Sequence, residues 1–152
     1  MTGNAKAVLR RRFAAPIERV FAACTRAELL ARWFSPKVFD TCDVEVDLRV
    51  GGRFAFGMVG APGTYAAEGI YREITPPERL VLTWRWTKGP PHEPPDGITS
   101  LVTIDLGRDG DGTILTLTHE GLPDRAQADS HGEGWSETFD KLARLLEEGS
   151  AS

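Results

Sequence analysis

The residues best suited to chemistry in this sequence are its histidines, its two cysteines and the acids beside them. His131 and Glu133, separated by one glycine, match the histidine-x-glutamate half of a zinc deaminase signature, which also needs a later Pro-Cys-x-x-Cys segment. No cysteine follows Cys42, and Cys24 and Cys42 fit neither a metal knuckle nor a disulfide framework. We therefore predict no metal and no cofactor. Ser130 and Glu133 have the spacing of a helix capping box, so we expect His131 and Glu133 to belong to a helix start.

His119 is the second candidate for acid–base chemistry. It alternates in phase with Leu115 and Leu117, so its side chain should point to the same side of a strand as those leucines. An inward imidazole could bind a ligand carbonyl or transfer a proton, or it could be a core histidine bonded to a neighbouring carbonyl. Tyr71 and Glu68 lie on opposite faces of one segment, which argues against a Glu–Tyr acid–base pair unless a bulge intervenes. With no Gly-x-Ser-x-Gly nucleophile elbow in the chain, the balance is against an enzyme, and His119 is a weak catalytic candidate.

Four tryptophans are the side chains that lose most by exposure to water: Trp33, Trp84, Trp86 and Trp135. Each ring could bury about 150–250 Å². They could fill a core, or they could form the wall of an apolar pocket, where a few polar groups orient a bound molecule. The composition leaves both readings open.

Alternating apolar and polar residues predict strands in the first segment and through the middle of the chain. The clearest is 78–86, in which Leu80, Leu82, Trp84 and Trp86 share one face. The other predicted strands are 6–13, 43–48, 50–60, 63–74, 98–107 and 112–122, with a turn at Gly51–Gly52 and a hairpin formed by the last two. The proline-rich segment 87–97 either covers an opening or is a solvated connection.

Helical spacing predicts two short helices early in the chain and one long helix at its end. The first covers about 15–25, and the second, about 25–34, begins with Thr25 and Glu28 as a capping box and ends before Pro36. The long helix covers 130–148 and presents one apolar stripe, after which Gly149 should end it.

The totals are those of one soluble domain. The chain has 152 residues, of which 41% are hydrophobic and 26% charged, and a net charge of −4 without a basic patch, so we predict no nucleic-acid partner. No apolar run approaches the roughly 18 residues of a membrane span, and the first residues lack the apolar core of a signal peptide, so we expect a cytoplasmic protein. We predict a single domain over 1–152, with a core at about 5–148 and a loose tail at 149–152.

This order of elements predicts an α+β fold. A twisted antiparallel sheet of six to seven strands should curl around the long C-terminal helix, and the two short helices after the first strand should close one end. Such an arrangement encloses either a filled core or a cavity.

Five segments together resemble the heat-shock protein 90 ATPase activator homologue-like family of the SRPBCC, START-like superfamily, which includes the birch-pollen-allergen-like proteins. They are "AAPIERVFAACTRAELLARWF", "DLRVGGRF", "GIYREITPPERLVLTWRW", "TLTHEGLP" and "HGEGWSETFDKLARLLEE", and they extend over roughly residues 5 to 148. The resemblance implies a helix-grip fold with a cavity between sheet and C-terminal helix. Superfamily members use that cavity for lipids, polyketides, hormones and other apolar molecules.

We therefore predict that the protein binds a small hydrophobic or amphipathic molecule in this cavity. The expected cavity residues are Trp33, Phe54, Phe56, Met58, Tyr71, Leu82, Trp84, Trp86, Leu117, His119, Trp135, Phe139 and Leu142. The alternatives are a cyclase- or hydrolase-like enzyme that uses His119, and a stress-related co-chaperone suggested by the family name. The chain is too short for the separate chaperone-binding domain of the eukaryotic activator, so we do not expect a chaperone partner. The sequence leaves a homodimer open.

Overall fold

The computed structural model of the chain describes residues 5–88 and 99–150. Within these residues the chain forms seven strands and three helices. In chain order they are β1 (Ala5–Phe13), α1 (Ile17–Thr25), α2 (Ala27–Trp33), β2 (Phe39–Val46), β3 (Arg53–Gly60), β4 (Gly63–Thr75), β5 (Arg79–Lys88), β6 (Ser100–Asp109), β7 (Gly112–Leu122) and α3 (Arg125–Ser150).

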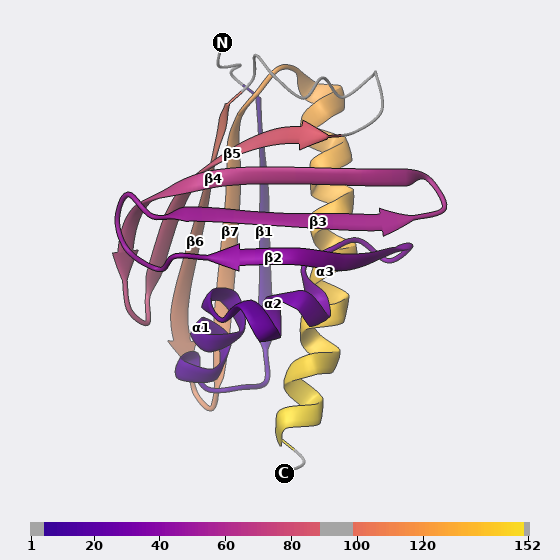
Figure 1. Cartoon of the computed structure of the whole chain (residues 1–152). Helices are drawn as coiled ribbons and strands as arrows, with labels where there is room; N and C mark the ends of the chain where they lie inside the picture. Colours follow the sequence, from indigo (N-terminus) through magenta and orange to yellow (C-terminus); the bar gives the residue numbers. More distant parts are fainter. Residues whose placement is uncertain (1–4, 89–98, 151–152) are drawn as a thin grey trace.

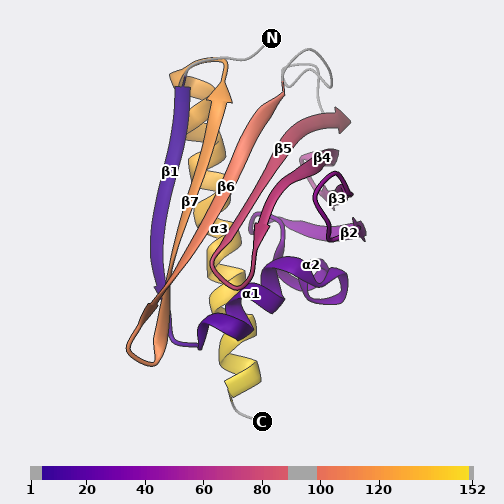
Figure 2. The ribbon, with the colours of Figure 1, turned by 90° about the vertical axis from the view of Figure 1, so that its left-hand side faces the viewer.

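The strands form one antiparallel sheet in the order β1-β7-β6-β5-β4-β3-β2. Every strand from β2 to β7 pairs with its neighbour in the chain, and β1 joins the free edge of β7. Figures 1 and 2 show that the sheet curls around α3, while α1 and α2 lie at the end where α3 finishes. The predicted helix-grip fold is confirmed.

Alternation along the strands places the core between the sheet and α3. Phe54 and Phe56 of β3 and Leu82 of β5 are buried on the concave face, and Phe139 and Leu142 of α3 are buried against it. Each such side chain contributes on the order of 1.5–3 kcal/mol when it leaves water, so this layer supplies much of the stability.

Strand β2 differs from the strand predicted at 43–48. It begins at Phe39, ends at Val46, and its register with β3 shifts between Cys42 and Glu45. Asp43 adopts a φ of 51° at this bulge. A bulge inserts a residue that the alternation of side chains does not reveal, which is why the period alone misplaced the strand.

The predicted capping box at the start of α3 is wrong. The helix begins at Arg125, and Asp124 caps it by accepting a hydrogen bond from the Gln127 backbone N–H at 2.9 Å, so Ser130 lies inside the helix. Asp is as good an N-cap as Ser, and its side chain satisfies an amide of the first turn. His131 and Glu133 are therefore helix-interior residues and not part of a cap.

The capping box predicted for the second helix is also wrong. Thr25 is the last residue of α1, and its hydroxyl donates to the Phe21 carbonyl at 2.8 Å. Arg26 occupies the N-cap position of α2 without a side-chain cap, and Glu28 pairs with Arg26 at 2.7 Å. A threonine that bonds back to the preceding turn is not available to cap the next one.

Three further predictions concern the end of the last helix, the proline-rich segment and the glycine turn. Helix α3 continues through Gly149 to Ser150, so Gly149 does not end it, and 151–152 lie outside the described residues. Most of the predicted loop 87–97 also lies outside the described residues. The turn at Gly51 and Gly52 is confirmed, and Gly51 takes a φ of 87°, which favours glycine.

Within the described residues, no helix combines the length and hydropathy needed to cross a membrane.

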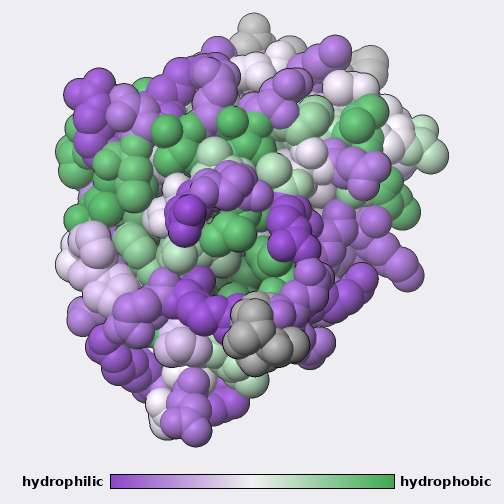
Figure 3. Space-filling view, turned by 60° about the horizontal axis from the view of Figure 1, so that its bottom comes forward, coloured by the Kyte–Doolittle hydropathy of each residue, from purple (hydrophilic) through white to green (hydrophobic). Residues whose placement is uncertain are grey.

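The end of the molecule where α1, α2 and the last turns of α3 lie has a hollow in its surface. Figure 3 shows hydrophilic side chains around this hollow and hydrophobic side chains at its floor.

Candidate ligand-binding pocket

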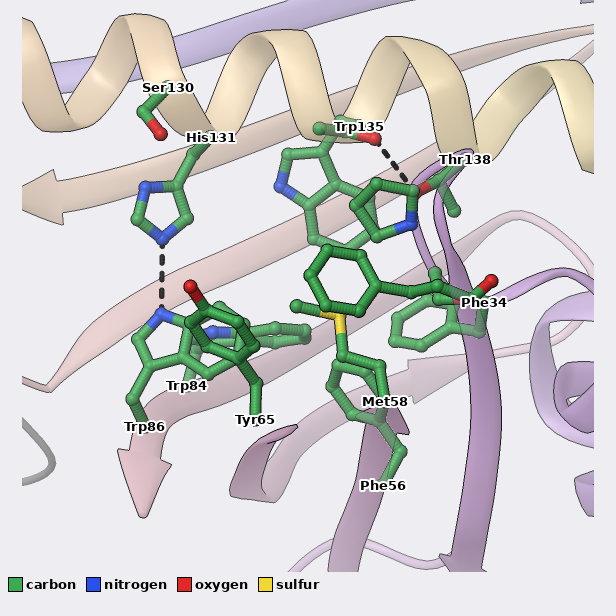
Figure 4. Close-up of a pocket in the computed structure, with 14 residues that line it drawn as sticks. Phe34, Phe56, Met58, Tyr65, Trp84, Trp86, Ser130, His131, Trp135 and Thr138 are labelled. Carbon is green, nitrogen blue, oxygen red and sulfur yellow. Dashed lines mark hydrogen bonds between the residues drawn. The ribbon is translucent and has the colours of Figure 1, made fainter. Parts of the chain in front are cut away.

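A pocket of about 180 Å³ lies between the first half of α3 and the concave face of the sheet. It is lined by Phe34, Ser35, Pro36, Phe39, Phe56, Met58, Tyr65, Trp84, Trp86, Ser130, His131, Gly134, Trp135 and Thr138. Figure 4 shows Phe56, Met58, Tyr65 and the two β5 tryptophans projecting from the strands toward α3, from which His131, Trp135 and Thr138 point back. Ser130 is exposed and lies at the rim. The pocket wall therefore comes from α3, β3, β4, β5, the first residue of β2 and the connection between α2 and β2.

The wall is built mainly from aromatic rings in edge-to-face contact. Phe34 packs against Phe56 with ring centroids 4.9 Å apart and against Trp135 at 5.4 Å. Trp84 lies 5.4 Å from Trp135 and 5.7 Å from Trp86. Such pairs contribute about 0.5–1.5 kcal/mol each beyond the area they bury, so the wall is fixed by its own packing.

Two indole–imidazole hydrogen bonds connect α3 to the sheet beside the pocket. Trp86 of β5 donates its Nε1–H to His131 Nε2 at 3.1 Å (Figure 4), and Trp135 of α3 donates its Nε1–H to His119 Nδ1 at 3.1 Å. An indole N–H can only donate, so the accepting nitrogen of each imidazole must be unprotonated. The geometry thus assigns both histidines a neutral form.

His119 is fully enclosed by these contacts. Its exposed fraction is 0%, and its Nε2–H donates to Ser100 Oγ at 2.7 Å, which in turn donates to the Trp84 carbonyl at 3.3 Å. Burial, and secondarily the nearby His131, lowers the pKa of His119 well below its ordinary value of 6.5. Both ring nitrogens are bonded to protein groups, and the imidazole does not line the pocket. His119 is therefore a buried core histidine, and its partners are a hydroxyl and an indole in place of the neighbouring carbonyl that we expected.

A polar tie between α3 and the connection before β2 holds two residues of the pocket wall, Ser35 and Phe39. Lys141 donates to the Phe39 carbonyl at 2.7 Å and to Ser35 Oγ at 3.1 Å, and Thr41 donates to the same Ser35 oxygen at 2.8 Å. Partial burial lowers the pKa of Lys141. The Lys141 ammonium donates to a carbonyl and to a hydroxyl that has its own donor and acceptor partners. We therefore assign Lys141 the role of anchoring Ser35 and Phe39.

One buried donor near the pocket has no partner among the described residues. The Nε1–H of Trp84, whose residue is 3% exposed, is sealed from solvent without a hydrogen bond. Leaving such a group unpaired costs about 1–3 kcal/mol. The packing of the surrounding rings must offset this cost.

The structure divides the predicted cavity residues into two groups. Five line the pocket: Phe56, Met58, Trp84, Trp86 and Trp135. The others are buried in the core and do not line the pocket: Trp33, Phe54, Tyr71, Leu82, Leu117, His119, Phe139 and Leu142. Trp33 donates its indole N–H to the Ala23 carbonyl at 2.9 Å. Tyr71 and Glu68 face opposite sides of β4, as predicted, because Tyr71 is buried while Glu68 pairs with Arg53 on the outer face.

Several pocket residues were not predicted, although two of them had a usable signal. Tyr65 precedes Tyr71 by an even number of residues and therefore faces the same side of β4. His131 lies four residues before Trp135 on the same helical face, which becomes visible once the helix is started at Asp124. Phe34, Ser35, Pro36 and Phe39 lie in or beside an irregular connection, where periodicity carries no information.

The described residues contain no group of three or more His, Cys, Asp or Glu side chains placed to hold a metal ion. Cys24 is buried in the core, which raises the pKa of its thiol to about 12 and makes it a poor nucleophile. The site is therefore an apolar pocket in which a few polar side chains form hydrogen bonds with other protein groups.

Comparison with known proteins agrees with this geometry. A sequence model of the family described as Activator of Hsp90 ATPase homolog 1-like protein matches residues 14–147. Comparison with curated proteins gives no significant match.

Similar solved structures come from several bacteria. A protein from Chromobacterium violaceum is 30% identical with a TM-score of 0.83, and the match covers 93% of this chain and 96% of that one. A protein named AHSA1 from Silicibacter pomeroyi is 28% identical with a TM-score of 0.83 and coverage of 95% and 99%. A Nitrosomonas europaea protein is 29% identical with a TM-score of 0.80 and coverage of 97% of both chains.

Proposed function

The chain belongs to the family of Activator of Hsp90 ATPase homolog 1-like proteins, and from that premise we propose that it binds one small, uncharged, ring-shaped apolar molecule in the pocket between α3 and β3–β5. The observation that carries the proposal is the wall itself: of the lining residues within 5–88 and 99–150, seven are aromatic and none is Asp, Glu, Lys or Arg.

The size of the pocket limits the ligand. Its volume of about 180 Å³ is close to the roughly 150 Å³ of an engineered apolar cavity that holds one benzene molecule, and below the roughly 300–1,000 Å³ of pockets for drug-sized ligands. A single ring with short substituents fits this volume, whereas a long acyl chain or a fused polyketide does not without movement of the walls.

The chemistry of the pocket wall limits the charge of the ligand. His131, Trp86 and Ser35 already use their polar atoms on other protein groups, so they offer little to an incoming charge. A charged ligand would lose its hydration without gaining an opposite charge, which is costly in an apolar site. Indole and phenyl edges and faces suit a neutral aromatic ring.

Titration with fluorobenzene, followed by ¹⁹F NMR, tests the proposal. We expect saturable binding, and at a hundred times the dissociation constant we expect the free energy of unfolding to rise by about 2.7 kcal/mol. Tetramethylammonium and dodecanoate serve as cationic and long-chain probes, because an aromatic box can also hold a cation. Binding of either of these in place of fluorobenzene, or binding of none of the three, would contradict the proposal.

Two glycines of α3 provide matched variants. A Cβ on Gly134 would meet Pro36 Cγ of the pocket wall at 3.5 Å, and a Cβ on Gly132 would meet Ala7 Cβ of β1 at 3.8 Å, so both positions accept alanine. Gly134→Leu should fill the pocket and abolish fluorobenzene binding, with Gly134→Ala weakening it. Gly132→Ala should leave the affinity unchanged, since its methyl group faces β1. Equal effects at both positions would show that the probe binds elsewhere.

The two alternatives from the sequence receive no support of this kind. A proton-transfer role for His119 would require access to the pocket, which its burial and its two hydrogen bonds deny. The family takes its name from an activator of the Hsp90 ATPase, and no feature of residues 5–88 and 99–150 argues for carrying that role to this chain.

A further inference from the structure

We propose that a pH-sensitive tie holds one wall of the pocket in place: Trp86 bonds His131 only while that imidazole is neutral, so that protonation of His131 weakens ligand binding. This inference rests on the proposed function, because it concerns the regulation of the same site.

The bond geometry fixes the proton positions. His131 Nδ1 lies 2.8 Å from the Gln127 carbonyl, which can only accept, so Nδ1 carries the hydrogen. His131 Nε2 therefore has a free lone pair, and Trp86 Nε1–H donates to it at 3.1 Å. Protonation would place a second N–H on Nε2, opposite the indole N–H, and an attractive contact would become a repulsive one.

The location of the tie connects it to the ligand site. Both residues line the pocket, and both are half-buried, so water can reach the imidazole. The Trp86 ring also contacts Tyr65 at 5.8 Å and Phe56 at 6.4 Å, and these are parts of the same wall. When the bond to His131 is lost, Trp86 is no longer held between β5 and α3, and the wall that it forms becomes free to move.

The groups around His131 do not offset the added charge. From β7, the His119 ring lies 4.9 Å away and is itself held neutral by burial. From β4, Tyr65 lines the same pocket, and Lys88 at the end of β5 is exposed.

The nearest acids on α3 itself point to solvent. Asp129 and Glu133 are exposed, and Asp129 pairs with Arg125 at 3.6 Å. Among the described residues that line the pocket there is no carboxylate, so none of them would hold an imidazolium in place.

Fluorobenzene affinity measured by ¹⁹F NMR at about pH 8 and about pH 5.5 tests the proposal, since the probe has no titratable group and its own charge is the same at both values. In the unmodified chain we expect the dissociation constant to rise about tenfold at the lower pH, the equivalent of one lost hydrogen bond. His131→Gln should remove this dependence, because the amide oxygen accepts from Trp86 and does not titrate. His119→Gln should retain it. An affinity that is equal at both pH values, or that changes as much in His131→Gln, would overturn the tie.

A second measurement separates the tie from the proposed function. The Trp86 indole N–H signal in ¹H–¹⁵N NMR should shift between the two pH values in the unmodified chain and stay fixed in His131→Gln. Failure of fluorobenzene to bind at either pH would remove the proposed function, while the indole signal would still decide the tie. An indole signal that ignores pH would remove the tie even where the probe binds.

Discussion

At the scale of single residues, the two imidazoles beside the pocket each accept a hydrogen bond from a tryptophan of the opposite layer. A tryptophan of the sheet, Trp86, donates to a histidine of the helix, and a tryptophan of the helix, Trp135, donates to a histidine of the sheet, His119. Each bond crosses between the layers and supplies an acceptor for an indole N–H that would otherwise be unpaired. They differ in access to water, since His131 is half-buried and His119 is enclosed. We therefore assign the switch to His131 and a structural role to His119.

Substitution of His119 tests that structural role. His119→Leu removes the acceptor of the buried Trp135 N–H, and we expect it to lower the free energy of unfolding by about 2 kcal/mol, the usual cost of an orphaned buried donor. His119→Gln keeps one acceptor and one donor and should cost about 1 kcal/mol or less. Urea denaturation measures both. A leucine variant as stable as the glutamine variant would show that the Trp135–His119 bond contributes nothing.

At the scale of elements, the position of the helix start decides what α3 presents to the sheet. With its first turn at Arg125, the helix places His131, Trp135, Thr138 and Leu142 along one stripe that faces the concave surface. In a helix that began at Ser130, Gln127 would lie before the helix, and its carbonyl would not be held one turn from His131 to accept from Nδ1.

Two alanine variants distinguish these starts. Asp124→Ala removes the side chain that accepts from the Gln127 amide, and it should lower the free energy of unfolding by about 1 kcal/mol. Ser130→Ala replaces an exposed serine inside the helix, so its effect on stability should lie within about 0.5 kcal/mol. Thermal and urea unfolding of the pair measure the difference. The reverse order would place the helix start at Ser130.

The helices and strands can be predicted from the sequence, but several of their first and last residues cannot. The alternation of 78–86 and the stripe of the last helix depend on local periodicity, which burial on one side imposes directly. The cap at Asp124 is a local contact with the Gln127 amide three residues later, which is the same spacing as Ser130 and Glu133, so spacing alone does not decide where the helix begins. The bulge at Asp43 is fixed by pairing with β3 and leaves no periodic trace.

At the scale of the whole molecule, periodicity predicts which way a side chain points but not whether it meets a cavity or the packed core. Leu117, Leu142 and Trp135 were all expected to face inward, and all are buried. Of these three, only Trp135 lines the pocket. Leu117 and Leu142 belong to a buried cluster that also contains side chains of α1 and α2, the helices at the end where α3 finishes (Figure 1). Which inward residues meet a cavity is therefore a property of the assembled layers.

The same enclosure makes the stability of the whole fold depend on pH through His119. Burial holds the folded-state pKa of His119 well below 6.5, whereas an unfolded histidine takes up a proton near that value. Below about pH 6.5 the unfolded chain binds one proton more than the folded chain, so the free energy of unfolding should fall by up to about 1.4 kcal/mol per pH unit as the pH decreases. Urea denaturation between about pH 7.5 and pH 5, above the range where most carboxylates titrate, should show this slope in the unmodified chain and a smaller one in His119→Gln. Parallel slopes in the two proteins would mean that His119 is charged in the fold, which the hydrogen bond from Trp135 to its Nδ1 does not permit.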